Sequence, residues 1–178
     1  MTRLHWVILA AVAFVAGLIL MLLSTRVMGE GLAFMPRGGS DLLKAVAAAN
    51  PPILREVAAG HRTDSQWLEY LASKSTLEPR ERATLAAYLD VNGPFDPAAG
   101  VPAPPDGRML AEEECQSCHS LFSSYLMQSR DLQGWRNIFL SPFHKQLKLD
   151  ARKREEFARY SAINMPMRAE DVPSDMRF

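Results

Sequence analysis

The chain has 178 residues, 48% of them hydrophobic, and twenty basic and twenty acidic residues leave a formal net charge of zero. This balance argues against a nucleic-acid-binding protein, which needs an excess of basic side chains. The length is enough for an apolar N-terminal segment followed by one or two small domains.

The apolar run from Trp6 to Leu23 contains no charged residue. At a helical rise of about 1.5 Å per residue, it nearly spans a hydrocarbon core of about 30 Å. It is longer than the apolar part of a usual signal peptide, and no Ala-x-Ala cleavage site follows it. We therefore predict an uncleaved single-pass membrane anchor over residues 1–30. Removal of this segment as a signal peptide is the alternative.

The remaining sequence resembles two copies of one helical unit. A shift of 68 positions places Trp67 on Trp135, and after a four-residue insertion in the second copy a shift of 72 places Tyr88 on Tyr160. Such internal similarity predicts a duplicated domain, with copies over residues 38–95 and 106–178. The proline-rich stretch 96–105 between them is predicted to be a semi-rigid linker.

The apolar spacing predicts an all-α fold without strands. In the first copy, helices are expected from Ser40 or Asp41 to about Asn50, after a cap at Asp64 or Ser65, and from Glu78–Pro79 onward. In the second copy, helices are expected over residues 107–115, 134–140 and 150–163.

The motif Cys115-Gln-Ser-Cys118-His119 carries most of the functional information. Two thiols three positions apart, followed at once by a histidine, are typical of covalent attachment of a c-type haem. Cys115 and Cys118 would form the thioether bonds, and His119 would bind the iron. A redox-active dithiol or half of a zinc site is the alternative, although the chain has no other cysteines and only three other histidines.

With this motif, the Trp135 helix and a last helix containing Glu156–Tyr160, the second copy resembles class I cytochromes c. It looks most like the small cytochrome domains of quinohaemoprotein amine dehydrogenases. The resemblance implies one covalent haem c and a last helix that crosses the first. The first copy has Ala47, Asn50 and Pro51 at the positions of Cys115, Cys118 and His119. It is therefore expected to be a haemless cytochrome c-like domain.

The sixth iron ligand does not follow the family pattern. The loop before the last helix, where the family places a methionine, contains His144 instead. His144 is our first choice as the sixth ligand, with Met165 or Met167, which follow the last helix, as alternatives. A haem without a sixth protein ligand also remains open. Methionine ligation would give a higher potential than histidine.

No catalytic motif is recognisable in the chain, so we expect an electron carrier and not an enzyme. The predicted function is a monohaem cytochrome anchored in the inner membrane, with its haem domain in the periplasm. It would carry single electrons between redox proteins in or on the membrane. The alternatives are an electron-transfer or structural subunit of a larger membrane oxidoreductase complex, and a haem sensor of gas or redox state.

Overall fold

The computed structural model describes residues 32–97, 99, 102–115 and 120–177. Internal contacts divide the chain after Phe34, and Met35–Phe178 form one compact unit. Its described residues form helices and turns and contain no strand, which confirms the predicted all-α class. The predicted anchor lies outside the described residues. Within the residues that are described, no helix has the length and apolar character needed to cross a membrane.

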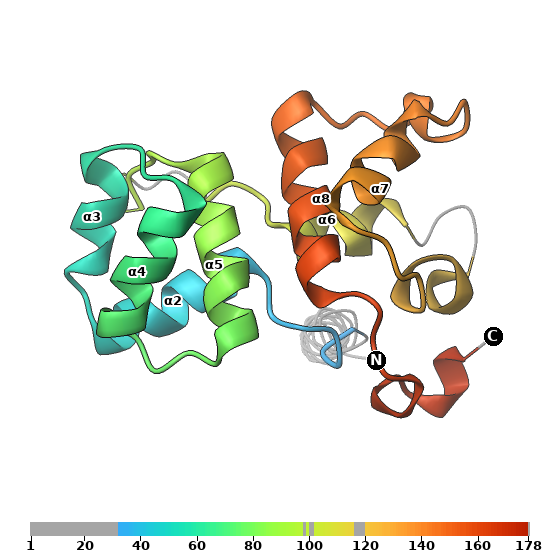
Figure 1. Cartoon of the computed structure of the whole chain (residues 1–178), viewed down its shortest axis with the longest axis horizontal. Helices are drawn as coiled ribbons and strands as arrows, with labels where there is room; N and C mark the ends of the chain where they lie inside the picture. The colour runs from blue at the N-terminus through green and yellow to red at the C-terminus, as the bar shows by residue number, and fades with distance from the viewer. Residues whose placement is uncertain (1–31, 98, 100–101, 116–119, 178) are drawn as a thin grey trace, which may run out of the picture. The chain divides into compact units, whose positions relative to one another are not determined.

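The first half of this unit, residues 35–95, contains four helices: α2 (Gly39–Ala49), α3 (Ile53–Ala59), α4 (Asp64–Lys74) and α5 (Pro79–Asn92) (Figure 1). Helix α4 starts at a capping box between Thr63 and Gln66, one residue before the predicted cap. Helix α5 starts as predicted, with Glu78 as the N-cap and a proline in the first turn.

The second half, residues 106–177, contains α6 (Gly107–Glu114), α7 (Leu132–Asn137) and α8 (Ala151–Asn164). Each of these helices begins after an aspartate whose carboxylate accepts a backbone N–H of the first turn; these caps are Asp106, Asp131 and Asp150. The connections contain a π-helical turn and two 3₁₀ turns: η1 (Phe122–Leu126), η2 (Ile138–Leu140) and η3 (His144–Gln146). Two more 3₁₀ turns follow α8: η4 (Ala169–Asp171) and η5 (Ser174–Met176).

The helices of the two halves start at the spacings found in the sequence. Helices α6 and α7 begin 68 positions after α2 and α4, and α8 begins 72 positions after α5. The extra four residues fall between α7 and α8, where η3 lies. The division into cytochrome-like domains stays a prediction, because the two halves belong to one compact unit.

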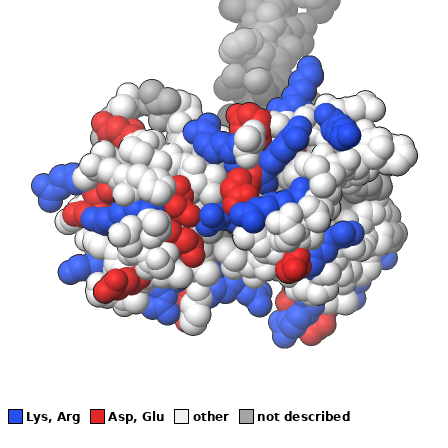
Figure 2. Space-filling model, turned by 45° about the horizontal axis from the view of Figure 1, so that its top comes forward, with Lys and Arg blue, Asp and Glu red and all other residues white. Residues whose placement is uncertain are grey.

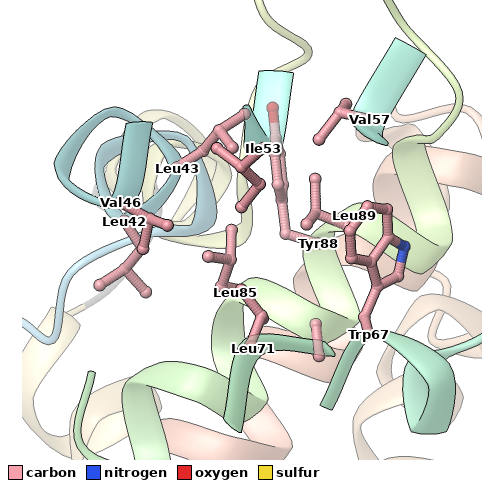
Figure 3. Packing of buried hydrophobic residues seen from close by; sticks show 11 residues of the cluster. Leu42, Leu43, Val46, Ile53, Val57, Trp67, Leu71, Leu85, Tyr88 and Leu89 are labelled. Atoms are coloured by element: carbon pink, nitrogen blue, oxygen red, sulfur yellow. The ribbon is translucent and has the colours of Figure 1, made fainter. Parts of the chain in front are cut away.

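Each half has its own buried core, and Figure 3 shows that of the first half. Side chains from all four helices meet there, including the fully buried Leu42, Ile53 and Leu85. Basic and acidic side chains are interspersed on the face that Figure 2 shows, in keeping with the zero net charge.

In both halves, the first helix crosses the last helix at a glycine that faces a tyrosine. A Cβ atom on Gly107 would lie 2.1 Å from the Cβ of Tyr160, and one on Gly39 would lie 2.2 Å from the Cβ of Tyr88. Because Cβ atoms are held by the backbone, the helices would have to move apart to accept any side chain. The two glycines therefore allow the close crossing of α2 with α5 and of α6 with α8.

We expect Gly107→Ala to lower the free energy of unfolding by about 3 kcal/mol, because it overpacks the contact between α6 and α8. Thermal and denaturant unfolding would measure this loss. Gly60→Ala is the matched control, since a Cβ atom on Gly60 would have nothing within 4 Å and its backbone is extended. Equal stability of the two variants would contradict the proposed tight crossing.

Candidate functional site

The second half contains a cavity of about 390 Å³ between the end of α6, the segment 138–149 and α8. Its wall is mainly apolar and is made by Ile138, Phe139, Phe143, Leu147, Leu149 and Phe157. Four groups with polar or ligating atoms complete it: Glu114, Cys115, His144 and Gln146. A mostly apolar cavity with a few polar groups is the usual form of a small-molecule or cofactor site.

Cys115 reaches this cavity from the C-terminal end of α6. Its backbone N–H donates to the carbonyl of Ala111 at 3.0 Å, which ends the helix at the motif. Burial, and secondarily the neighbouring Glu114 carboxylate, raise the pKa of its thiol to about 12. The thiol is therefore protonated at neutral pH. Cys118 and His119 lie outside the described residues, so the motif is seen only through its first cysteine.

His144 lines the same cavity as Cys115. It begins the 3₁₀ turn η3, within the segment that the second half has in addition to the first. Its Nδ1 lies 3.0 Å from the carbonyl oxygen of Ile138. A carbonyl can only accept, so Nδ1 is the donor in this contact and Nε2 is the nitrogen that could bind a metal. This hydrogen bond, from the other ring nitrogen to a backbone carbonyl, is the usual support of a metal-binding histidine.

The two alternative ligands, Met165 and Met167, are not among the described residues that line this cavity. Met165 is buried at the C-terminal end of α8, where its N–H donates to Ser161 at 2.9 Å. The N–H of Met167 donates to the carbonyl of Leu126 at 2.8 Å. Thus, of the three candidate sixth ligands, His144 is the one that shares the cavity with Cys115.

Aromatic rings form the inner wall behind the cavity. The ring of Phe157 packs against Phe139, Tyr125 and Trp135, with centroid distances of 5.6, 5.5 and 6.0 Å. The indole N–H of Trp135 is buried and has no hydrogen-bond partner in the described part of the chain. The same is true of Trp67 in the first half, so this unpaired donor does not by itself distinguish the two halves.

The sequence did not identify the aromatic wall in advance, but the alignment of the copies contains the signal. Phe139, Phe157 and Tyr125 stand where the first half has Leu71, Leu85 and Val57. These aliphatic positions are all buried in the first half. The second half therefore replaces aliphatic core residues by flat rings beside the cavity, which suits a flat aromatic group.

The residues present fit a haem c. The cavity joins a cysteine of the attachment motif, a histidine held by its second nitrogen, and an apolar and aromatic wall. In comparisons with known proteins, no protein-family model, no curated protein and no solved structure matches the chain.

Proposed function

We propose that the chain is a membrane-anchored c-type cytochrome with one haem, which carries single electrons between redox proteins. The observation that carries this proposal is the shared cavity of Cys115 and His144, because the cysteine begins a Cys-x-x-Cys-His motif. When bound, haem c supplies an iron centre that accepts and releases one electron. Residues 1–30 would hold the protein at the inner membrane, with the haem on the periplasmic side.

The residues of the chain would have separate tasks. Cys115 and Cys118 would hold the haem covalently, and His119 and His144 would bind its iron. The hydrogen bond to Ile138 would keep the His144 ring oriented. The rings of Phe139 and Phe157 would exclude water from the cavity, since both are nearly completely buried. This low-dielectric surrounding, together with the iron-binding residues, would set the potential.

The mouth of the cavity offers a contact surface for a protein partner. Phe143 lines the cavity and is 83% exposed, and Leu140, three residues earlier, is 69% exposed. Large exposed apolar side chains next to a site are a common feature of protein contacts. The same surface would serve a transient redox partner or the neighbouring subunit of a larger oxidoreductase complex. Purification in mild detergent separates these cases, since only the second gives stoichiometric partners.

The test of haem attachment is expression of the full chain in a host that matures c-type cytochromes. We expect the intact mass to increase by one haem, and the haem to resist acid–organic extraction. The double variant Cys115→Ser/Cys118→Ser should lose essentially all covalent haem, because both thioether bonds are removed. Ser117→Ala, inside the same motif, is the control and should retain it. A chain that leaves such a host without haem would refute the proposal.

A further inference from the structure

The two halves of Met35–Phe178 contact each other mainly through their last helices. The bonds between α5 and α8 connect the end of each helix to an earlier position of the other, so the helices run antiparallel (Figure 1). Asn92 donates to Oε2 of Glu156 at 3.0 Å, and Asn164 donates to the hydroxyl of Thr84 at 3.0 Å. Asn92 and Asn164 are equivalent positions 72 residues apart, and so are Thr84 and Glu156.

A second pair of contacts follows the same exchange. The hydroxyl of Tyr88 donates to the carbonyl of Pro104 at 2.9 Å, and that of Tyr160 donates to the carbonyl of Pro36 at 2.6 Å. The tyrosines are equivalent positions, and so are the prolines. Each contact is thus matched by one in the opposite direction from the equivalent donor, with Pro104 in the linker that leads into α6. This is the pattern of an isologous two-fold interface, here made within one chain.

At two positions of this interface the second half alone has an acid. Glu156 corresponds to Thr84, and Asp106 corresponds to Gly38. A Cβ atom on Gly38 would lie 2.2 Å from Oδ1 of Asp106. The Asp106 carboxylate cannot easily turn away, because it accepts from the N–H and hydroxyl of Ser40 at 3.0 and 2.5 Å and from the N–H of Met109 at 3.0 Å.

We propose that the first half is a built-in partner subunit, and that Asp106 and Glu156 prevent the second half from pairing with another copy of itself. This inference concerns the interface alone, so it goes beyond the proposed electron transfer and does not depend on haem. If two second halves paired in this geometry, Asp106 of one copy would take the place of Gly38. It would then lie directly against Asp106 of the other copy, where Gly38 now leaves room. This pairing would also bury two copies each of Asp106 and Glu156 in one interface. The overlap and the like charge of two Asp106 carboxylates, together with the cost of burying a second Glu156 carboxyl, disfavour such a pairing.

A third contact also selects the first half as the partner. Arg159 of α8 donates to the Asp90 carboxylate of α5 at 2.9 Å. The position equivalent to Asp90 in the second half is Ala162. A second copy of α8 therefore offers Arg159 no carboxylate at this place, whereas the first half does. The interface therefore favours the first half as a partner and disfavours another copy of the second half.

The experiment uses the full chain with a site-specific protease site inserted after Gly100, in the linker. After cleavage at micromolar concentration, we expect the two fragments to stay together as one 1:1 particle in size-exclusion chromatography and native mass spectrometry. Gly38→Asp/Thr84→Glu, which gives the first half both acids, should weaken this association at least 100-fold. Thr76→Glu is the control, because it makes one of these changes at an exposed position of the same half and should leave association unchanged.

A second variant keeps the proposal testable if the first half does not fold with the added acids. Asp106→Gly/Glu156→Thr removes both acids from the second half, and we expect the released second-half fragment to change from monomer to dimer. Separation of the unmodified fragments at this concentration would overturn the proposal. Self-association of the unmodified second-half fragment would also overturn it. A folded Asp106→Gly/Glu156→Thr fragment that remains monomeric would do the same.

Discussion

His144→Ala is expected to convert the haem from six-coordinate to five-coordinate with little change in its covalent attachment. His144 lines the cavity beside Cys115, and alanine has no atom that could reach the iron. The reduced variant should therefore bind carbon monoxide essentially completely, whereas the unmodified protein should not respond. Absorbance spectra of the reduced protein with and without carbon monoxide, and the magnetic signature of the oxidised haem, measure this change.

Gln146→Ala is the matched control for this substitution, because Gln146 lines the same cavity two residues later. It should leave the haem six-coordinate, which separates loss of a ligand from a general loosening of the turn η3. Met165→Ala tests the alternative ligand and should also have no effect on coordination. If His144→Ala stays low-spin without a carbon monoxide response, the sixth ligand is another residue, and Met165 and Met167 become the first candidates.

The sequence predicted the helices best where local chemistry determines their ends. Helix α5 starts at Glu78–Pro79 as expected, because proline fits only the first turn. Helix α8 was predicted within one residue at each end, and Asp150, where the predicted helix began, is its N-cap. In contrast, α2 starts at Gly39, before the expected caps at Ser40 or Asp41, since the side chain of Ser40 instead binds Asp106 of the other half. A contact between distant segments overrode the local capping preference.

Helix α3 and the π-helical turn η1 were not predicted, and both are short. Helix α3 has seven residues, and the π-helical turn η1 has five. Segments of this length show too few apolar repeats to establish a helical period. In the candidate site, the proposed ligand His144 was identified from its place in the loop that contains the insertion. The aromatic wall was missed, because a single phenylalanine in a helix is as typical of an ordinary core position as of the wall of a ligand cavity.

The burial of Glu156 was also not predicted, and it follows from the position of α8 between the helices of its own half and the last helix of the other half. Helix α8 packs against α6 and α7 of its own half and against α5 of the other. It therefore buries Phe157 on one side and Glu156, Tyr160 and Asn164 on another. The last three are four residues apart and form one stripe along the helix. A stripe of mixed polarity is typical of a helix packed through hydrogen bonds, but it resembles a solvated face in the sequence.

The free energy of unfolding is expected to fall as the pH rises from about 5 to 8, and Glu156→Gln should remove this dependence. Burial raises the pKa of the Glu156 carboxyl from its ordinary value of 4.5 to about 8, with an added contribution from Asp106. Hydrogen bonds from Gly107 and Asn92 and the charge of Arg159 act in the opposite direction. Between these two pKa values, the folded chain keeps a proton that the unfolded chain has lost. The stability lost across this interval is at most about 5 kcal/mol.

Chemical denaturation at a series of pH values, compared between the unmodified chain and Glu156→Gln, measures this contribution. The difference between the two proteins cancels the contribution of every ionisable group that is unchanged in both. Glu155→Gln is the matched control: ion pairs with Arg136 and Arg159 hold the pKa of Glu155 to about 2, so it is ionised throughout this interval. Its removal should shift the stability by a constant amount and leave the slope unchanged. An equal slope in the unmodified chain and in Glu156→Gln would mean that the buried carboxylate is ionised at neutral pH, held by Asn92 and Gly107 against the cost of its burial.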